Sequence, residues 1–235
     1  MRRALAFLTP LPVGTAGAPD RRTLAWFPVV GALIGTALGG VWWGADRLWP
    51  PAVAAALVVA ADLALTGMLH FDGLIDSADG LLPHLPTERR LEVMEQPDVG
   101  AFGVTVAIAV IGLRFAALAS MTPHVLLLAG IWCASRTAMA AISGALPYAR
   151  EHGLATSVAG GAWRPIALYG LIASVSLGAF AGGRVQEAAV ASVFVGALGV
   201  AGLARRRIRG FTGDVLGAAG VIGETVALVI ASAKW

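Results

Sequence analysis

The sequence is poor in charge, in cysteine and in tyrosine. Only 13% of its 235 residues are charged while 57% are hydrophobic, and soluble domains carry about 25% charged residues. So few charges cannot build a water-soluble surface, which excludes a soluble globular domain. The single cysteine, Cys133, excludes an intramolecular disulfide. The formal net charge of +3 is small, and the basic residues stand between apolar runs, which indicates membrane topology and not nucleic-acid binding.

The first residues, MRRALAFL, resemble the start of a signal peptide. The apolar stretch from Ala4 to Leu8 is too short for a signal peptide, and Pro10 and Pro12 interrupt it. We therefore expect an interfacial helix or a capping segment here.

Seven apolar stretches approach the roughly 20 residues that a membrane-spanning helix needs. They are residues 24–45, 51–69, 101–120, 124–146, 165–182, 188–204 and 214–233. There is no low-complexity tract and no obvious repeat. We expect one all-α domain over residues 1–235, a polytopic bundle of six to seven transmembrane helices. Glycines spaced four apart, such as Gly31, Gly35 and Gly39, allow such helices to pack closely.

The basic residues predict the orientation of this bundle. With a cytoplasmic N-terminus, only three basic residues face outward, namely Arg47, Arg184 and Lys234. Twelve face the cytoplasm: Arg2, Arg3, Arg21, Arg22, Arg89, Arg90, Arg150, Arg164, Arg205, Arg206, Arg207 and Arg209. The three long connections, residues 71–100, 147–164 and 205–213, fall on the same side. We therefore expect a protein of the cell inner membrane with its active site at the cytoplasmic face.

An acidic segment, HFDGLIDSADG at residues 70–80, follows the second apolar stretch. On a helix, Asp72, Asp76 and Asp79 stand at i, i+4 and i+7 and share one face. Three carboxylates near a membrane repel one another, and a divalent cation neutralises them best. Mg²⁺ commonly takes one or two carboxylates together with substrate phosphates. The spacing therefore predicts half of a magnesium site that a phosphate ligand would complete. The alternative is a solvated helix end.

Smaller features of this segment extend the hypothesis. Gly73 and Gly80 leave room for a bulky ligand or a sharp turn. His70 is a candidate catalytic residue that could also orient a carboxylate, bind substrate or simply lie at the interface. The loop that follows, with Glu92 and Glu95, adds acidity or is solvated.

A second polar element precedes the last apolar stretch. Its arginines are topology signals or grip an anionic substrate, because guanidinium groups match phosphates. Arg207 and Arg209 are the candidates there. The motif Thr212-Gly213-Asp214 comes next, and Gly213 is a further candidate for a substrate contact. Asp214 is either a helix cap or a fourth carboxylate near the metal.

Four charges lie inside the apolar stretches: Asp62, Arg114, Arg136 and Glu224. Charges within a membrane are costly and normally paired. From their distances to the ends of their stretches, all four lie at a similar depth. We expect a structural network of mutual pairs near the midplane, while Arg136 stays a candidate for a substrate contact.

Several motifs together resemble the cobalamin synthase family, also called adenosylcobinamide-GDP ribazoletransferase. They are FLTPLPV near the N-terminus, LHFDGLIDSADG, GAFGV, the pair Ser135-Arg136, and TGDVLGAAGVIGE near the C-terminus, so the resemblance covers nearly the whole chain. It implies an integral membrane transferase that joins adenosylcobinamide-GDP to α-ribazole or its 5′-phosphate and releases GMP. It also implies dependence on Mg²⁺ and leaves room for association with other cobalamin-assembly enzymes.

The sequence departs from the family pattern in two places. Pro10 stands where relatives tend to have a basic residue, and the stretch before GAFG reads MEQPD where relatives tend to be basic. Phosphate contacts are therefore expected from Arg150, Arg164 or the arginines between 205 and 209. We expect Asp72, Asp76 and Asp79, with Asp214, to hold the metal, and Asp79 or else Asp214 to accept the hydroxyl proton.

Three rival functions remain. A lipid-making CDP-alcohol phosphotransferase shares the metal chemistry, but Ile75 and Asp76 stand where its motif has Ala-Arg. A transporter would place polar residues around a cavity at the midplane. A corrinoid-binding scaffold would lack turnover.

Overall fold

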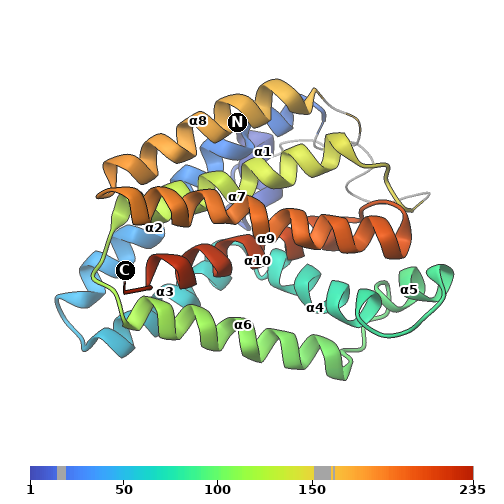
Figure 1. Ribbon diagram of the computed structural model, residues 1–235, viewed down its shortest axis with the longest axis horizontal. Helices are drawn as coiled ribbons and strands as arrows, with labels where there is room; N and C mark the ends of the chain where they lie inside the picture. Colours follow the sequence, from blue (N-terminus) through green and yellow to red (C-terminus); the bar gives the residue numbers. More distant parts are fainter. Residues whose placement is uncertain (15–19, 151–159, 161, 235) are drawn as a thin grey trace.

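The computed structural model is a bundle of helices and describes residues 1–14, 20–150, 160 and 162–234 (Figure 1). Its elements, in chain order, are α1 (Arg2–Leu8), the 3-10 helix η1 (Thr23–Trp26), α2 (Phe27–Asp46), α3 (Pro51–Leu65), α4 (Leu69–Leu81), α5 (Thr87–Val93), α6 (Ala101–Ala119), α7 (Val125–Ala145), α8 (Trp163–Phe180), α9 (Arg184–Ile208) and α10 (Gly213–Ala231). The prediction of an all-α bundle is confirmed.

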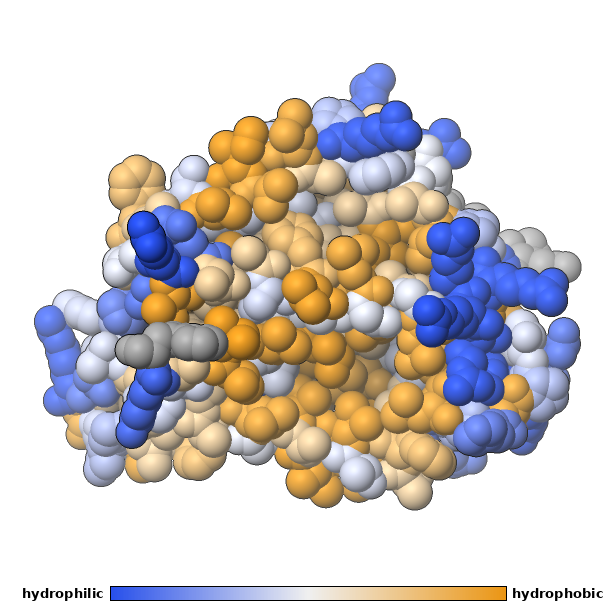
Figure 2. Space-filling view, viewed as in Figure 1, coloured by the Kyte–Doolittle hydropathy of each residue, from blue (hydrophilic) through white to orange (hydrophobic). Residues whose placement is uncertain are grey.

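Six helical segments are long and apolar enough to cross a membrane, and α3 with α4 makes a seventh if that bent pair counts as one span. This agrees with the six to seven spans predicted. Apolar side chains form a broad band across the molecule, with hydrophilic residues gathered at its two ends (Figure 2). Such a band is what a lipid bilayer would cover, because lipid cannot hydrate exposed charge.

The second predicted span, residues 51–69, is wrong in its C-terminal part. Helix α3 ends at Leu65, and α4 begins at Leu69 with its axis turned by 89°. The turn lies at Gly67 and Met68, both with a left-handed φ of 58°. Glycine adopts this conformation without strain. The turn therefore ends α3 although the sequence stays apolar through Leu69.

Helix α7 is the centre of the bundle. Every residue from 127 to 140 is buried, and α2, α8, α9 and α10 pack around it. A side-chain carbon at Gly31 or Gly35 of α2 would overlap the α7 backbone at Trp132 or Leu128. The close approach of small residues that the glycine spacing predicts is therefore present.

The N-terminal segment caps one part of the bundle. Ala4 and Leu8 of α1 are fully buried, and the ring of Phe7 stacks on Phe27 of α2 with 5.8 Å between centroids. This confirms the expected capping segment.

The connections separate into two ends of the bundle (Figure 1). Helix α5, the end of α7, the start of α8 and the end of α9 lie at one end, and they carry or adjoin Arg89, Arg90, Arg150, Arg164 and the arginines between 205 and 209. The turns between α2 and α3 and between α8 and α9 lie at the other end, with the C-terminus. The arrangement agrees with the charge bias, and which end faces the cytoplasm stays a prediction.

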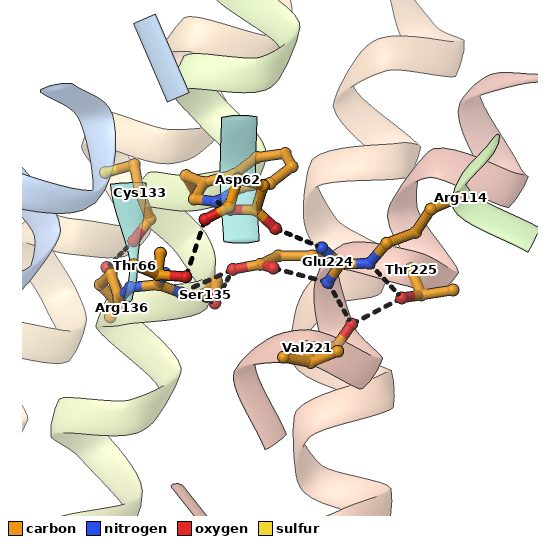
Figure 3. A network of polar contacts seen from close by, with 11 residues as sticks. Asp62, Thr66, Arg114, Cys133, Ser135, Arg136, Val221, Glu224 and Thr225 are labelled. Carbon is orange, nitrogen blue, oxygen red and sulfur yellow. Dashed lines mark hydrogen bonds and ion pairs between the residues drawn. The ribbon is translucent and has the colours of Figure 1, made fainter. Parts of the chain in front are cut away.

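The four charges inside the apolar stretches form one buried network (Figure 3). Arg114 of α6 lies 2.6 Å from Asp62 of α3 and 2.7 Å from Glu224 of α10. Arg136 of α7 lies 2.6 Å from the other oxygen of Glu224. The predicted mutual pairing is confirmed, and it ties four helices together.

Neutral groups complete the hydrogen bonding of this network. The indole N–H of Trp132 donates to Asp62 at 3.0 Å, and the Ser135 hydroxyl donates to Glu224 at 2.7 Å. The Nε of Arg114 donates to the hydroxyl of Thr225 at 2.9 Å. Buried ion pairs are stable only when such extra bonds satisfy the remaining lone pairs and protons.

Candidate active site

The acidic segment and the Thr-Gly-Asp motif meet at one cavity of about 210 Å³. Asp72 comes from the first turn of α4, and Asp214 from the first turn of α10. The lining residues are Phe7, Leu69, His70, Asp72, Met139, Tyr148, Arg150, Gly213, Asp214, Leu216 and Gly217. Two motifs more than 130 residues apart in the sequence thus share one site.

Helices α4 and α10 pack closely because glycine stands at their contact. A side-chain carbon at Gly73 would come within 2.8 Å of the Asp214 backbone. One at Gly217 would come within 3.0 Å of the His70 backbone. Gly73 therefore allows the close contact that brings Asp72 beside Asp214. The expectation that Gly73 leaves room for a ligand is wrong.

Asp214 is not the cap of its helix. The hydroxyl of Thr212 caps α10 by accepting a hydrogen bond from the Val215 N–H at 3.3 Å. Asp214 is left half-buried with its carboxylate in the cavity. Of the two alternatives that the sequence left open, the structure favours a fourth carboxylate at the site.

Negative charge accumulates around Asp76. Asp72, Asp214 and Asp79 all act on its carboxyl group electrostatically, and Arg150 partly offsets them. Asp72 and Asp76 stand one helical turn apart on α4. Asp76, however, does not line the cavity, so the predicted cluster of Asp72, Asp76 and Asp79 is not formed as such.

Arg150 is the cation of this cavity. One of its terminal nitrogens lies 3.1 Å from Asp214, and its Nε lies 3.1 Å from Glu95. The segment before it is fixed by two backbone hydrogen bonds to Phe211, from Phe211 N–H to Pro147 and from Ala149 N–H to Phe211. These bonds fix the chain that follows α7 and so hold Arg150 at the site.

His70 faces the cavity without a partner. Only 4% of its surface is exposed, and neither ring nitrogen has a hydrogen bond among the described residues. A buried polar group normally has a partner, so an orphan calls for an explanation. Because His70 lines the cavity, a bound substrate would supply the missing hydrogen-bond partner.

Asp79 does not line the cavity. Its carboxylate accepts hydrogen bonds from the backbone N–H groups of Gly100 at 2.8 Å and Gly103 at 2.9 Å, at the start of α6. Asp79 therefore caps α6, because its carboxylate accepts hydrogen bonds from N–H groups that have no partner within that helix. Asp79 lies about 10 Å along α4 from Asp72, at 1.5 Å per residue, which separates it from the site.

Gly80 and Gly213 differ in their surroundings. Gly80 packs against Met94, whose sulfur would lie 2.7 Å from an added side-chain carbon, so it leaves no room for a ligand. Gly213 lines the cavity and has nothing within 4 Å of such a carbon. Only Gly213 keeps the expected place beside a ligand.

Four of the arginines proposed to bind substrate lie elsewhere. Arg136 belongs to the buried network. Arg164 is exposed at the start of α8 with its guanidinium over the Trp163 ring, and Arg207 and Arg209 end α9. None of the four lines the cavity. Sequence position alone could not separate Arg164, Arg207 and Arg209 from Arg150, because all four flank apolar stretches.

The apolar part of the cavity was not predicted. Phe7, Met139, Tyr148 and Leu216 come from α1, α7, the chain after α7, and α10. Their positions follow from helix packing, and the sequence carries no local signal for it. These four lining residues are called the apolar wall below, and His70, Asp72, Arg150 and Asp214 the polar wall.

The residues fit a magnesium ion in one particular way. Among the described residues, no three His, Cys, Asp or Glu side chains gather into a ready metal site. Asp72 and Asp214 nevertheless face one cavity, and Mg²⁺ is commonly bound by one or two carboxylates with phosphates completing the shell. The donors therefore suit a metal that arrives with a phosphate ligand.

Taken together, the fold and the cavity define a polytopic membrane protein with an acidic site, containing one arginine, between its helices. The sequence matches the family model described as cobalamin-5-phosphate synthase over residues 1–232. The chain belongs to this family.

Curated relatives that match this chain along nearly their whole length share one name. The adenosylcobinamide-GDP ribazoletransferase of Bradyrhizobium diazoefficiens is 37% identical, covering 99% of this chain and 93% of the relative. Those of Brucella anthropi and Leptothrix cholodnii are 35% and 34% identical, covering 96% and 95% of this chain and 93% and 91% of theirs. No solved structure matches the chain.

Proposed function

We propose that this chain is an adenosylcobinamide-GDP ribazoletransferase of the cell inner membrane. It transfers the adenosylcobinamide phosphate group from adenosylcobinamide-GDP to α-ribazole or its 5′-phosphate and releases GMP. The family and its named relatives support this activity. The observation that carries the site is the single cavity shared by Asp72 and Asp214.

Binding and positioning fall to the polar wall of the cavity. Arg150 would bind the diphosphate of the donor, since a guanidinium group matches phosphate oxygens. Asp72 and Asp214 would hold Mg²⁺ together with the same phosphates, and Asp76 adds negative charge beside them. When bound, the metal would supply neutralisation of charge on the leaving GMP.

His70 would act as the base. The acceptor hydroxyl oxygen forms a bond to the phosphorus that carries cobinamide, and the bond from that phosphorus to the bridging oxygen breaks. GMP leaves with the electron pair, and the hydroxyl proton moves to one of the two unpartnered ring nitrogens of His70. Asp79, which caps α6, is left out of this step, and so is Asp214, which would be committed to the metal.

The apolar wall would receive the acceptor. A cavity of about 210 Å³ would take part of the acceptor, whereas the corrinoid is far too large for it and must stay outside. Phe7 and Tyr148 offer aromatic faces to a planar base. The donor would thus reach the cavity with its diphosphate alone, from the end where α5 and the end of α9 lie. We place that end in the cytoplasm because eight arginines lie in or beside the segments at that end, whereas the turns at the other end carry Arg47 and Arg184.

The decisive experiment follows GMP release by purified protein. Adenosylcobinamide-GDP, α-ribazole and Mg²⁺ should all be required, and omission of any one should stop turnover. Asp72→Asn should abolish turnover while the protein elutes as the wild type in detergent. Asp46→Asn, an exposed aspartate at the other end of the bundle, is the matched control and should stay active.

The outcomes separate the alternatives. Turnover without added α-ribazole would contradict the acceptor, and activity with a CDP-alcohol in place of the donor would favour the lipid-enzyme reading. Retained turnover in Asp72→Asn would remove the carboxylate from the chemistry.

A further inference from the structure

A second cavity of about 320 Å³ lies between α7, α8 and α9, apart from the site described above. Its floor comes from Ala138, Ala141, Ile142 and Ala145 of α7. Its other wall is a stripe of α9 at helical spacing: Phe194, Ala197, Leu198, Ala201, Gly202 and Arg205. Small residues on both helices create the groove, because their side chains do not fill the space between the axes.

The groove opens toward the lipid-facing surface. Leu198 on its wall is 64% exposed, in a helix long and apolar enough to span the membrane. The stripe from Phe194 to Arg205 covers about 17 Å along the helix at 1.5 Å per residue. An apolar channel of this length, parallel to the helices, matches an acyl chain lying along the protein.

The end of the groove has a different chemistry. Arg205 and Trp163 line it there, and Arg164 lies with its guanidinium 5.7 Å from the Trp163 ring. Tryptophan is enriched at the membrane–water interface. No acidic side chain within the described ranges forms an ion pair with Arg205. The groove therefore ends at interface depth in a positive charge that has no ion-pair partner among the described residues.

We propose that this groove binds an anionic phospholipid, with one acyl chain between α7 and α9 and the phosphate headgroup on Arg205. The apolar walls fit the chain, and the arginine selects the negative headgroup over a zwitterionic one. The site is separate from the reaction and gives one reason for the enzyme to reside in a membrane.

Photolabelling in nanodiscs tests the proposal. The probe is phosphatidylglycerol with a photoreactive group in its acyl chain, diluted in phosphatidylcholine. Wild-type protein should be labelled on α7 and α9 at residues of the groove. Gly202→Leu should abolish this labelling, because nothing lies within 4 Å of a side-chain carbon there and leucine would fill the space. Gly112→Leu, also unobstructed but on α6, should be labelled as the wild type.

The headgroup is tested separately. Competition by unlabelled phosphatidylglycerol should exceed competition by phosphatidylcholine, and Arg205→Gln should reduce that preference about fivefold, as expected for one basic residue facing anionic lipid. Unchanged labelling in Gly202→Leu, or an unchanged preference in Arg205→Gln, would overturn the proposal.

Discussion

A side-chain carbon on Gly103 of α6 would overlap the carboxylate of Asp79 on α4. The glycine lets that carboxylate reach the backbone N–H groups at the start of α6. The Gly-Ala-Phe-Gly motif is therefore part of a helix cap, and Asp79 is the other part.

The cap predicts a specific loss of stability. Gly103→Ala should lower the free energy of unfolding by about 1–3 kcal/mol, because buried N–H groups lose their acceptor. Thermal unfolding in detergent would measure it. Asp79→Ala should cost a similar amount, and the double variant should cost less than the sum. Additive losses would contradict the cap, and Gly112→Ala, which meets no neighbour, is the control.

The contact between α4 and α10 predicts a loss of turnover. Gly73→Ala should reduce kcat at least about tenfold, because the added methyl group separates Asp72 from Asp214 and misplacement of about 1 Å is costly in catalysis. GMP release measures kcat. Gly44→Ala, which has open space around it, should keep the wild-type rate, and an unaffected Gly73→Ala would show that the two carboxylates do not act together.

The buried network predicts rescue by a second substitution. Arg114→Gln should destabilise the fold by about 3–5 kcal/mol, since it leaves buried carboxylates without their cation. Adding Asp62→Asn should recover much of this loss, because Glu224 keeps Arg136 as its partner. Denaturation in a fixed detergent compares the three proteins. A double variant less stable than Arg114→Gln would refute the pairing.

The position of Arg150 predicts an effect on the donor. Arg150→Gln should raise the KM for adenosylcobinamide-GDP by about tenfold or more, from loss of charge-assisted hydrogen bonds. Arg164→Gln should leave this KM unchanged, because Arg164 does not line the cavity. Steady-state kinetics at saturating α-ribazole would measure the donor KM of the two variants. Equal increases in KM would mean that both arginines contact the donor.

The apolar wall predicts an effect on the acceptor. Phe7→Ala should raise the KM for α-ribazole about tenfold, which corresponds to about 1.4 kcal/mol of lost contact. The KM for the donor should stay near the wild-type value. An increase confined to the donor would reverse the assignment of the two walls.

The sequence predicted features that depend on few residues. Charge content and apolar runs identified the bundle, and the cost of buried charge identified the pairing of Asp62, Arg114, Arg136 and Glu224 before any contact was known. The aspartate spacing correctly placed Asp72 and Asp76 on a helix. Each of these follows from a local pattern and one physical rule.

Other features depend on how helices meet. Asp79 shares a helical face with Asp72, yet it serves α6 because α6 begins beside its end of α4. The break at Gly67 is hidden by continuous hydropathy. Arg150, among many arginines, reaches the cavity because Pro147 and Ala149, just before it, form backbone hydrogen bonds with Phe211, and no local pattern reveals this.

The network also bears on the order in which the bundle can form. Glu224 belongs to the last helix, so the ribosome makes it after Asp62, Arg114 and Arg136. Arg136 has its ion pair with Glu224 alone among the described residues. Until α10 enters the bilayer, this arginine is a charge without a counter-ion, and the earlier helices cannot close around it. Insertion of α10 therefore supplies the partner of Arg136, and the same helix delivers Asp214, so a bundle that lacks α10 has no complete active site.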